Sequence, residues 1–94
     1  MKIKRIIWLD EIIEKLILKH NVSQAEVREV LNNNPHFRFV EKGHYPEENA
    51  YAAMGQTNSG RYLIAFFVYK KDRSALILSA RNMTDAERRR YEQR

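Results

Sequence analysis

Apolar residues in the first third of the chain recur at the spacing of a helix. The apolar residues at i, i+3, i+4, i+7 and i+8 are Leu9, Ile12, Ile13, Leu16 and Ile17. Charged residues occupy most of the positions between them, so the pattern predicts an amphipathic helix with one face buried. The short β-branched segment at residues 3–8 favours an opening strand before this helix.

A second helix is predicted from the signals at its two ends. Ser23 can cap the helix and Glu26, three residues later, completes a capping box. Val22 and Val27 occupy the positions of a hydrophobic staple. The helix should end in the asparagine run before Pro35, because proline disfavours helical backbone in the residue before it.

After Pro35 the hydrophobic period changes to two, which is typical of strands. The predicted strands are residues 36–42, 50–57, 61–70 and 74–80, with turns at 58–60 and 71–73. Residues 61–70 are apolar on both faces, which predicts a central strand. A final helix should start at Thr84, where Glu87 completes a second capping box.

The order of these elements predicts an α+β fold in one domain, residues 1–94. We expect an antiparallel sheet of four to five strands, because consecutive strands joined by hairpins pair side by side. Two helices precede the hairpins and one follows them, and we expect all three on one side of the sheet.

Composition narrows the class of protein. The chain has no cysteine, which excludes disulfides and thiolate metal sites. Acidic residues interrupt the apolar N-terminal segment, so we expect a cytoplasmic protein without a signal peptide or membrane span. The net charge of +5 favours a polyanion or an acidic protein as partner.

Several motifs in this order resemble the BrnT-type toxins of bacterial type II toxin-antitoxin pairs. They are Trp8, the Lys19-His20 pair followed by "NVS", and later "SGRYLIAFFVY", "ILSAR" and "T..ERRRY". The resemblance spans almost the whole chain, and the ending "SAR…T..ERRRY" is its most specific part. It implies a small ribonuclease with a RelE-like fold that inhibits growth by cutting mRNA. It also implies neutralisation by a BrnA-type ribbon-helix-helix antitoxin, through which any contact with DNA would be indirect.

The chain departs from the family pattern at two positions. Ile12 stands where the family often has lysine, and Ala50 stands where an arginine often precedes the central glycine. These departures motivate an alternative function. The chain would then be a catalytically weakened module that holds the antitoxin and supports repression of its own operon.

RNA cleavage without a metal needs groups that move a proton and cations that hold the developing charge. The three histidines are scattered and form no short metal-binding pair with each other or a carboxylate, so we expect neither a metal nor another cofactor. His20 is the predicted acid-base group, because histidine changes charge near neutral pH. Lys19 beside it is a predicted RNA contact. The alternative for both is to cap the end of the first helix.

Arg61 and Arg81 are the predicted phosphate contacts, since a guanidinium group binds phosphate through two parallel hydrogen bonds. They stand at the start of the central strand and at the end of the next one. The alternative for Arg61 is a solvated strand end, and for Arg81 an ion pair with Glu87 that anchors the last helix.

The last helix carries three successive arginines that fan through about 200° and cannot all face one ligand. We expect Arg89 to contact RNA while the rest of the run is solvated. Tyr91 is a candidate catalytic residue, although a terminal aromatic more often packs a helix onto a sheet.

Basic residues are also expected at strand ends and turns. They are Arg38, Lys42, Lys70, Lys71 and Arg73. Of these we assign Arg38, Lys70 and Lys71 to RNA binding, where they would add salt-dependent affinity without sequence preference. The alternative is that they protect the edges of the sheet by their charge.

Overall fold

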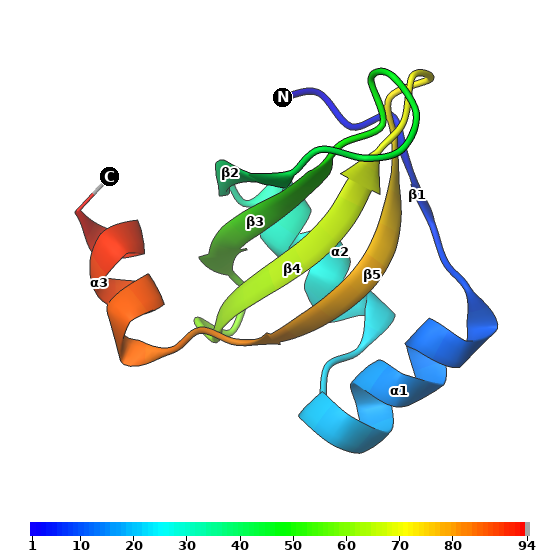
Figure 1. Cartoon of the computed structure of the whole chain (residues 1–94). Helices are drawn as coiled ribbons and strands as arrows, with labels where there is room; N and C mark the ends of the chain where they lie inside the picture. Colours follow the sequence, from blue (N-terminus) through cyan, green and yellow to red (C-terminus); the bar gives the residue numbers. More distant parts are fainter. Residues whose placement is uncertain (94) are drawn as a thin grey trace.

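The computed structural model describes residues 1–93, which form one mixed five-stranded sheet and three helices (Figure 1). In chain order the elements are β1 (Arg5–Ile7), α1 (Asp10–His20), α2 (Gln24–Asn32), β2 (His36–Glu41), β3 (Ala50–Gln56), β4 (Tyr62–Tyr69), β5 (Ser74–Asn82) and α3 (Asp85–Glu92). The predicted element types and their order are confirmed. β5 runs two residues beyond the predicted strand.

The strands lie in the order β1-β5-β4-β3-β2. The four strands β2 to β5 form consecutive antiparallel hairpins, as predicted, and β4 is central. β1 instead pairs parallel with β5, with Arg5 opposite Ser74 and Ile7 opposite Leu76. The prediction of a purely antiparallel sheet is therefore wrong for β1. The two helices after β1 carry the chain across the sheet, so β2 joins the opposite edge.

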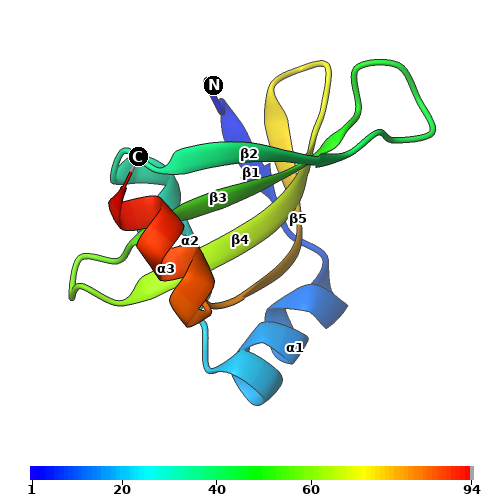
Figure 2. The ribbon, with the colours of Figure 1, turned by 60° about the vertical axis from the view of Figure 1, so that its left-hand side comes forward.

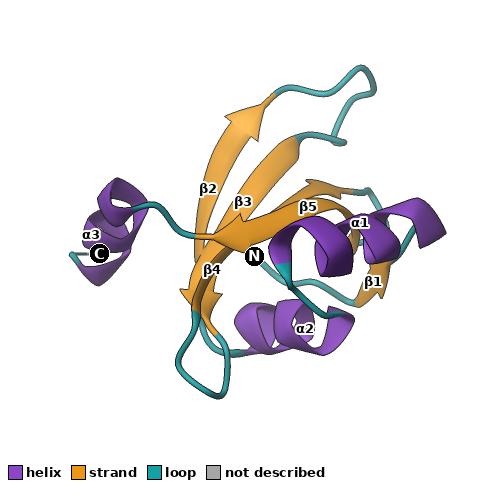
Figure 3. Ribbon diagram, turned by 90° about the horizontal axis from the view of Figure 1, so that it is seen from below, coloured by secondary structure: helices purple, strands orange, loops and turns teal. Residues whose placement is uncertain are grey.

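Helices cover both faces of the sheet, which corrects the prediction of one covered face. α1 and α2 lie on one side and α3 on the other, with the strands between them (Figures 2 and 3). β4 allows this arrangement because it is apolar on both faces. Leu63, Ala65 and Phe67 face the larger core under α1 and α2, whereas Ile64 faces the smaller core that holds Tyr91.

Close packing of α2 on the sheet depends on Gly55 of β3. A Cβ atom at this position would lie 3.2 Å from Val30 Cγ1 and 3.3 Å from the Val30 carbonyl oxygen. Val30 itself is fully buried. The glycine therefore sets the distance between α2 and β3.

The predicted start signals of α2 and α3 are confirmed. Ser23 caps α2 and exchanges hydrogen bonds with Glu26, and Thr84 does the same with Glu87 at the start of α3. α1 has no side-chain cap at its start, and the residue that follows its end, Asn21, is in the left-handed conformation with φ 52°. Within residues 1–93, no helix has the length and apolar character needed to cross a membrane.

Candidate functional site

Arg61 ties the start of β4 to the end of α1 and the start of α2. Its Nη2 donates to the carbonyl oxygen of His20 at 3.0 Å, and its Nη1 donates to the carbonyl oxygen of Asn21 at 2.6 Å. Nη1 also contacts the Glu26 carboxylate at 3.1 Å, and Nε donates to Asn82 Oδ1 at 2.9 Å. The predicted alternative of a solvated strand end is therefore wrong.

These contacts use four of the five N–H groups of the Arg61 guanidinium. Burial raises the pKa of Glu26, but hydrogen bonds from Ser23 and Arg61 together with the Arg61 charge outweigh it and lower the pKa overall. Glu26 is therefore a carboxylate that holds Arg61 in place. Arg61 keeps one N–H group for any ligand.

Arg81 lies on the opposite face of the sheet, beside α3. Its Nη1 and Nη2 form a fork onto the two carboxylate oxygens of Glu87, at 2.8 and 3.1 Å, and Nη1 also donates to the Asn82 carbonyl oxygen. The guanidinium carbon lies 5.4 Å from the centre of the Phe66 ring. Nε and one hydrogen of Nη2 remain unused. Arg81 therefore keeps two N–H groups on one edge of its guanidinium.

The pair of Arg81 and Glu87 is strongly coupled. The hydrogen bond from Arg81 is the largest cause that lowers the pKa of Glu87 to about 2, and the backbone N–H of Thr84 adds to it. The same hydrogen bond raises the pKa of Arg81. The predicted alternative for Arg81, an ion pair with Glu87, is thus present in the structure. It does not exclude a phosphate contact, because two N–H groups stay unused.

The two predicted phosphate contacts do not share one pocket. Leu63 pairs with Asn82 and Ile64 pairs with Arg81, so Arg61 and Arg81 lie at the same end of the sheet but on opposite faces. Asn82 joins them, since its side chain accepts from Arg61 and its carbonyl oxygen accepts from Arg81. We call the group of Arg61, Asn82 and Arg81 the polar edge, and it runs around the end of the sheet where β4 begins and β5 ends.

His20 and Lys19 lie at this same end, on the α1 side. Arg61 fixes the His20 backbone, whereas the His20 imidazole makes no hydrogen bond or ion pair among residues 1–93. Lys19 is exposed and equally without such a contact in the described chain. His20, Arg61 and Arg81 therefore lie at the same end of the sheet, with His20 and Arg61 on the α1 side and Arg81 on the α3 side.

Tyr91 lies in the smaller core beneath α3 and is only 5% exposed. Its ring packs edge-on against Tyr62 at 6.0 Å between centroids, and the Arg88 guanidinium lies 3.9 Å from the centre of the Tyr62 ring. This is the docking role that was the alternative for Tyr91. A direct part in chemistry would require α3 to move.

The face beside α3 carries a row of side chains that the sequence did not reveal as a group. Arg38, Ala52, Phe66 and Ser79 are successive partners across four strands. Ala52 has a small side chain and Phe66 is half-buried, so these two residues project little from the sheet. Arg38 lies at one end of the row, and the Arg81 guanidinium lies over the Phe66 ring. Phe66 was missed because in sequence it is one apolar residue of a central strand. Only the register places it between two cations.

The remaining predicted RNA contacts are dispersed. Lys70 and Lys71 lie at the β4–β5 turn, at the far end of the sheet from Arg81, and approach Glu48 and Glu47 at 3.1 and 3.9 Å. Arg38 and Arg89 are exposed, and neither forms an ion pair within residues 1–93. The described residues also contain no group of three or more His, Asp or Glu side chains arranged to hold a metal.

Comparison with known proteins identifies the family. The sequence model described as "Ribonuclease toxin, BrnT, of type II toxin-antitoxin system" matches residues 8–87. The chain belongs to the BrnT family. Among solved structures, this BrnT-family chain is similar to the Brucella abortus ribonuclease toxin BrnT, with 17% sequence identity and a TM-score of 0.60. The match covers 86% of this chain and 97% of the Brucella chain. No curated protein sequence matches.

Both departures from the BrnT pattern can be placed in the structure. Ile12 is half-buried and packs against the larger core, where its apolar side chain is suited to the site. Ala50 begins β3 opposite Val68, on the same face as Arg38 and Phe66. Neither residue is a hydrogen-bond partner of Arg61 or Arg81.

Proposed function

We propose that this chain is an endoribonuclease that cuts mRNA without a metal and thereby inhibits growth, acting in the cytoplasm. We further propose that its partner is a BrnA-type ribbon-helix-helix antitoxin. Membership of a family of ribonuclease toxins supports the reaction class. The observation that carries the site is Arg81, held by Glu87 above Phe66 with two N–H groups unused.

In this proposal the polar edge binds the RNA backbone at the scissile phosphate. Arg81 donates its two unused N–H groups to a phosphate oxygen and stabilises the charge that develops as the 2′-oxygen attacks phosphorus. The bond from phosphorus to the 5′-oxygen breaks, and His20 moves the proton of the 2′-hydroxyl to this leaving oxygen. The Phe66 ring supports the Arg81 guanidinium, whose central carbon lies 5.4 Å from the ring centre, and Arg38 holds the next phosphates. Glu87 fixes the guanidinium before RNA arrives, so little reorganisation is needed.

His20 is the acid-base group of this proposal. Arg61 acts as a positioning residue, because it binds the His20 carbonyl oxygen and so holds the end of α1 against β4. Lys19 and Arg89 add electrostatic attraction from exposed positions. Tyr91 contributes by seating α3, on which Glu87 lies.

The test is cleavage of RNA by the purified chain in EDTA, with the 5′ and 3′ ends mapped. Arg81→Ala is expected to lower the rate by about 100-fold or more, the size of effect seen when one donor to a developing oxyanion is lost. Glu87→Gln is the matched control, because it removes the ion pair but leaves the guanidinium. It should lose less activity than Arg81→Ala, because the guanidinium stays but is held less firmly, and circular dichroism should show both variants folded. Equal loss in the two variants would mean that Arg81 acts only through its pair with Glu87.

One observation favours the alternative of a weakened binding module. Both predicted phosphate contacts are already paired with carboxylates, Arg61 with Glu26 and Arg81 with Glu87. Expression of the chain with and without the neighbouring gene separates the two functions. Growth arrest and new RNA ends without that gene support the ribonuclease. Normal growth with folded chain, together with repression of the operon, supports the module.

A further inference from the structure

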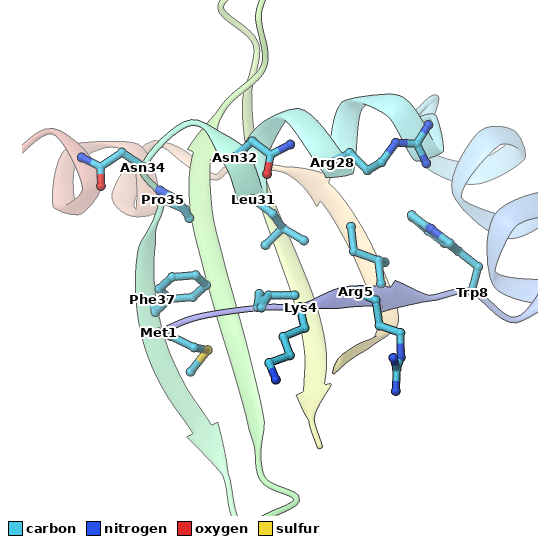
Figure 4. Close-up of a pocket in the computed structure, with 12 residues that line it drawn as sticks. Met1, Lys4, Arg5, Trp8, Arg28, Leu31, Asn32, Asn34, Pro35 and Phe37 are labelled. Carbon is cyan, nitrogen blue, oxygen red and sulfur yellow. The ribbon is translucent and has the colours of Figure 1, made fainter. Parts of the chain in front are cut away.

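A groove of about 800 Å³ lies on the α1 and α2 side of the sheet, away from Arg81 (Figure 4). α2 forms one wall, and the N-terminal segment leading into β1 forms the other. Trp8 and Arg28 lie at one end of the groove, and Phe37 and Met1 lie at the other. The groove is therefore elongated and takes no part in the polar edge described above.

The lining of the groove mixes apolar and polar side chains, and it comes from two parts of the chain, residues 1–8 and residues 28–37. Its apolar residues are Met1, Ile3, Ile6, Trp8, Leu31, Pro35 and Phe37. Several of them, such as Leu31 and Phe37, pack against the larger core and are only partly buried. The groove is thus an opening onto the core, and an apolar side chain that entered it would contact Leu31 and Phe37.

The charged residues of the groove are all cations. They are Lys4, Arg5 and Arg28, and no Asp or Glu lines it. Arg5 is paired with Asp72 at 2.6 Å, but Lys4 and Arg28 form no ion pair within residues 1–93. The lining amides of Asn32 and Asn34 also make no side-chain hydrogen bond in the described chain. Free cations around an apolar floor suit a ligand that is itself both acidic and apolar.

We propose that this groove binds an acidic, amphipathic segment of the antitoxin protein, a proposal that rests on the proposed function as a toxin. Large apolar side chains of the segment enter between Leu31 and Phe37. Its carboxylates pair with Arg28 on the α2 wall, and Lys4, whose side chain extends away from α2 in Figure 4, adds longer-range attraction. The Trp8 indole N–H, which has no partner among the described residues, lies beside Arg28 as a further donor.

The lining favours a protein segment over an RNA strand. RNA binds best where aromatic faces alternate with cations along a groove, because each nucleotide presents a base and a phosphate. Here the floor is largely aliphatic, and the Phe37 ring already packs edge-on against Phe67 at 6.1 Å between centroids. An aliphatic floor matches the leucine-like side chains of an amphipathic segment.

The position of the groove makes antitoxin binding separable from RNA cleavage. Arg28 and Leu31 lie on α2, whereas Arg81 and Phe66 lie on the other face of the sheet. Substitution of a groove residue should weaken the complex and leave the ribonuclease intact. Cells that carry such a variant should stay arrested even when the antitoxin is expressed.

The experiment uses Arg28→Glu and Leu31→Gln in the full chain, with Lys15→Glu as the matched control. Lys15 is exposed on α1, lies outside the groove and undergoes the same charge change as Arg28. The probe is the antitoxin encoded by the neighbouring gene, with affinity measured by calorimetry. We expect Arg28→Glu to weaken binding by about tenfold or more, because like charges then face each other. Lys15→Glu should stay within about threefold of the original affinity, as for a charge outside an interface.

RNA cleavage by each variant without antitoxin is measured in parallel. Groove variants that lose antitoxin affinity but cut RNA at the original rate support the proposal. Unchanged affinity in both Arg28→Glu and Leu31→Gln would overturn it, as would loss of RNA binding with the antitoxin complex intact, which would assign the groove to RNA. If the original chain cuts no RNA, the calorimetry still decides the groove, so the two proposals fail separately.

Discussion

Replacement of Arg61 by alanine tests whether this arginine is structural or contacts RNA. The change removes hydrogen bonds to the His20 and Asn21 carbonyl oxygens and to Asn82, together with the ion pair to Glu26. Both partners of the ion pair are about three quarters buried, with side chains 24% and 25% exposed. The Glu26 carboxylate would then lose its cation in a site with limited access to water.

The expected cost follows from these contacts. A hydrogen bond to a charged group contributes about 1.5 to 3 kcal/mol where it is well shielded. The contributions do not add fully, because water can replace the partners at the open end of α1. We therefore expect a loss of roughly 2 to 3 kcal/mol in the free energy of unfolding. For a domain of this size that corresponds to a decrease in Tm of roughly 10 to 20 °C.

Urea unfolding followed by circular dichroism measures this loss. Arg61→Lys is the control, since it keeps the charge near Glu26 but cannot reach all acceptors, and it should lie between the original chain and Arg61→Ala. A double-mutant cycle with Glu26→Ala should give a coupling energy of about 1 kcal/mol. An unchanged unfolding midpoint for Arg61→Ala, combined with loss of RNA cleavage, would refute the structural role and assign Arg61 to phosphate.

Three further outcomes are expected from the described contacts. Glu87 has a folded-state pKa of about 2 against an ordinary value of 4.5, so the stability it contributes is present above about pH 5 and is lost as the pH falls toward 2. Glu87→Gln should therefore remove about 2 kcal/mol of stability at pH 7 and little at pH 2, as measured by urea unfolding at each pH. Gly55→Ala should destabilise the fold by about 1 to 3 kcal/mol, because the new methyl group presses on Val30, and a Val30→Ala background should relieve part of that loss. RNA affinity should fall with rising salt, and Arg38→Ala should reduce that salt dependence while leaving the unfolding midpoint within about 0.5 kcal/mol.

The sequence by itself determined the local elements of this protein. The apolar stripe at residues 9–17 and the capping boxes at Ser23 and Thr84 involve residues three or four apart. All the groups that interact in these features lie within one short segment, so the sequence of that segment predicts them. The alternation after Pro35 and the apolar run of β4 likewise predicted the hairpins and the central strand. The ion pair of Arg81 with Glu87 could be anticipated for the same reason, since only six residues separate them.

Tertiary structure decided what depends on residues far apart in the chain. β1 pairs with β5, and Arg5 lies opposite Ser74 although the two residues are far apart in the sequence. The three residues of β1 are β-branched or basic, and nothing in them predicts β5 as the neighbouring strand. Arg61 finds its acceptors 21 to 41 residues away, so its sequence neighbours could not reveal these partners. The sequence predicted a phosphate contact, with a solvated strand end as the alternative. α3 lies on the second face because Ile64 and Met54 leave an apolar surface there that Tyr91 covers. Burial of that surface is a property of the assembled sheet, and no single segment contains it.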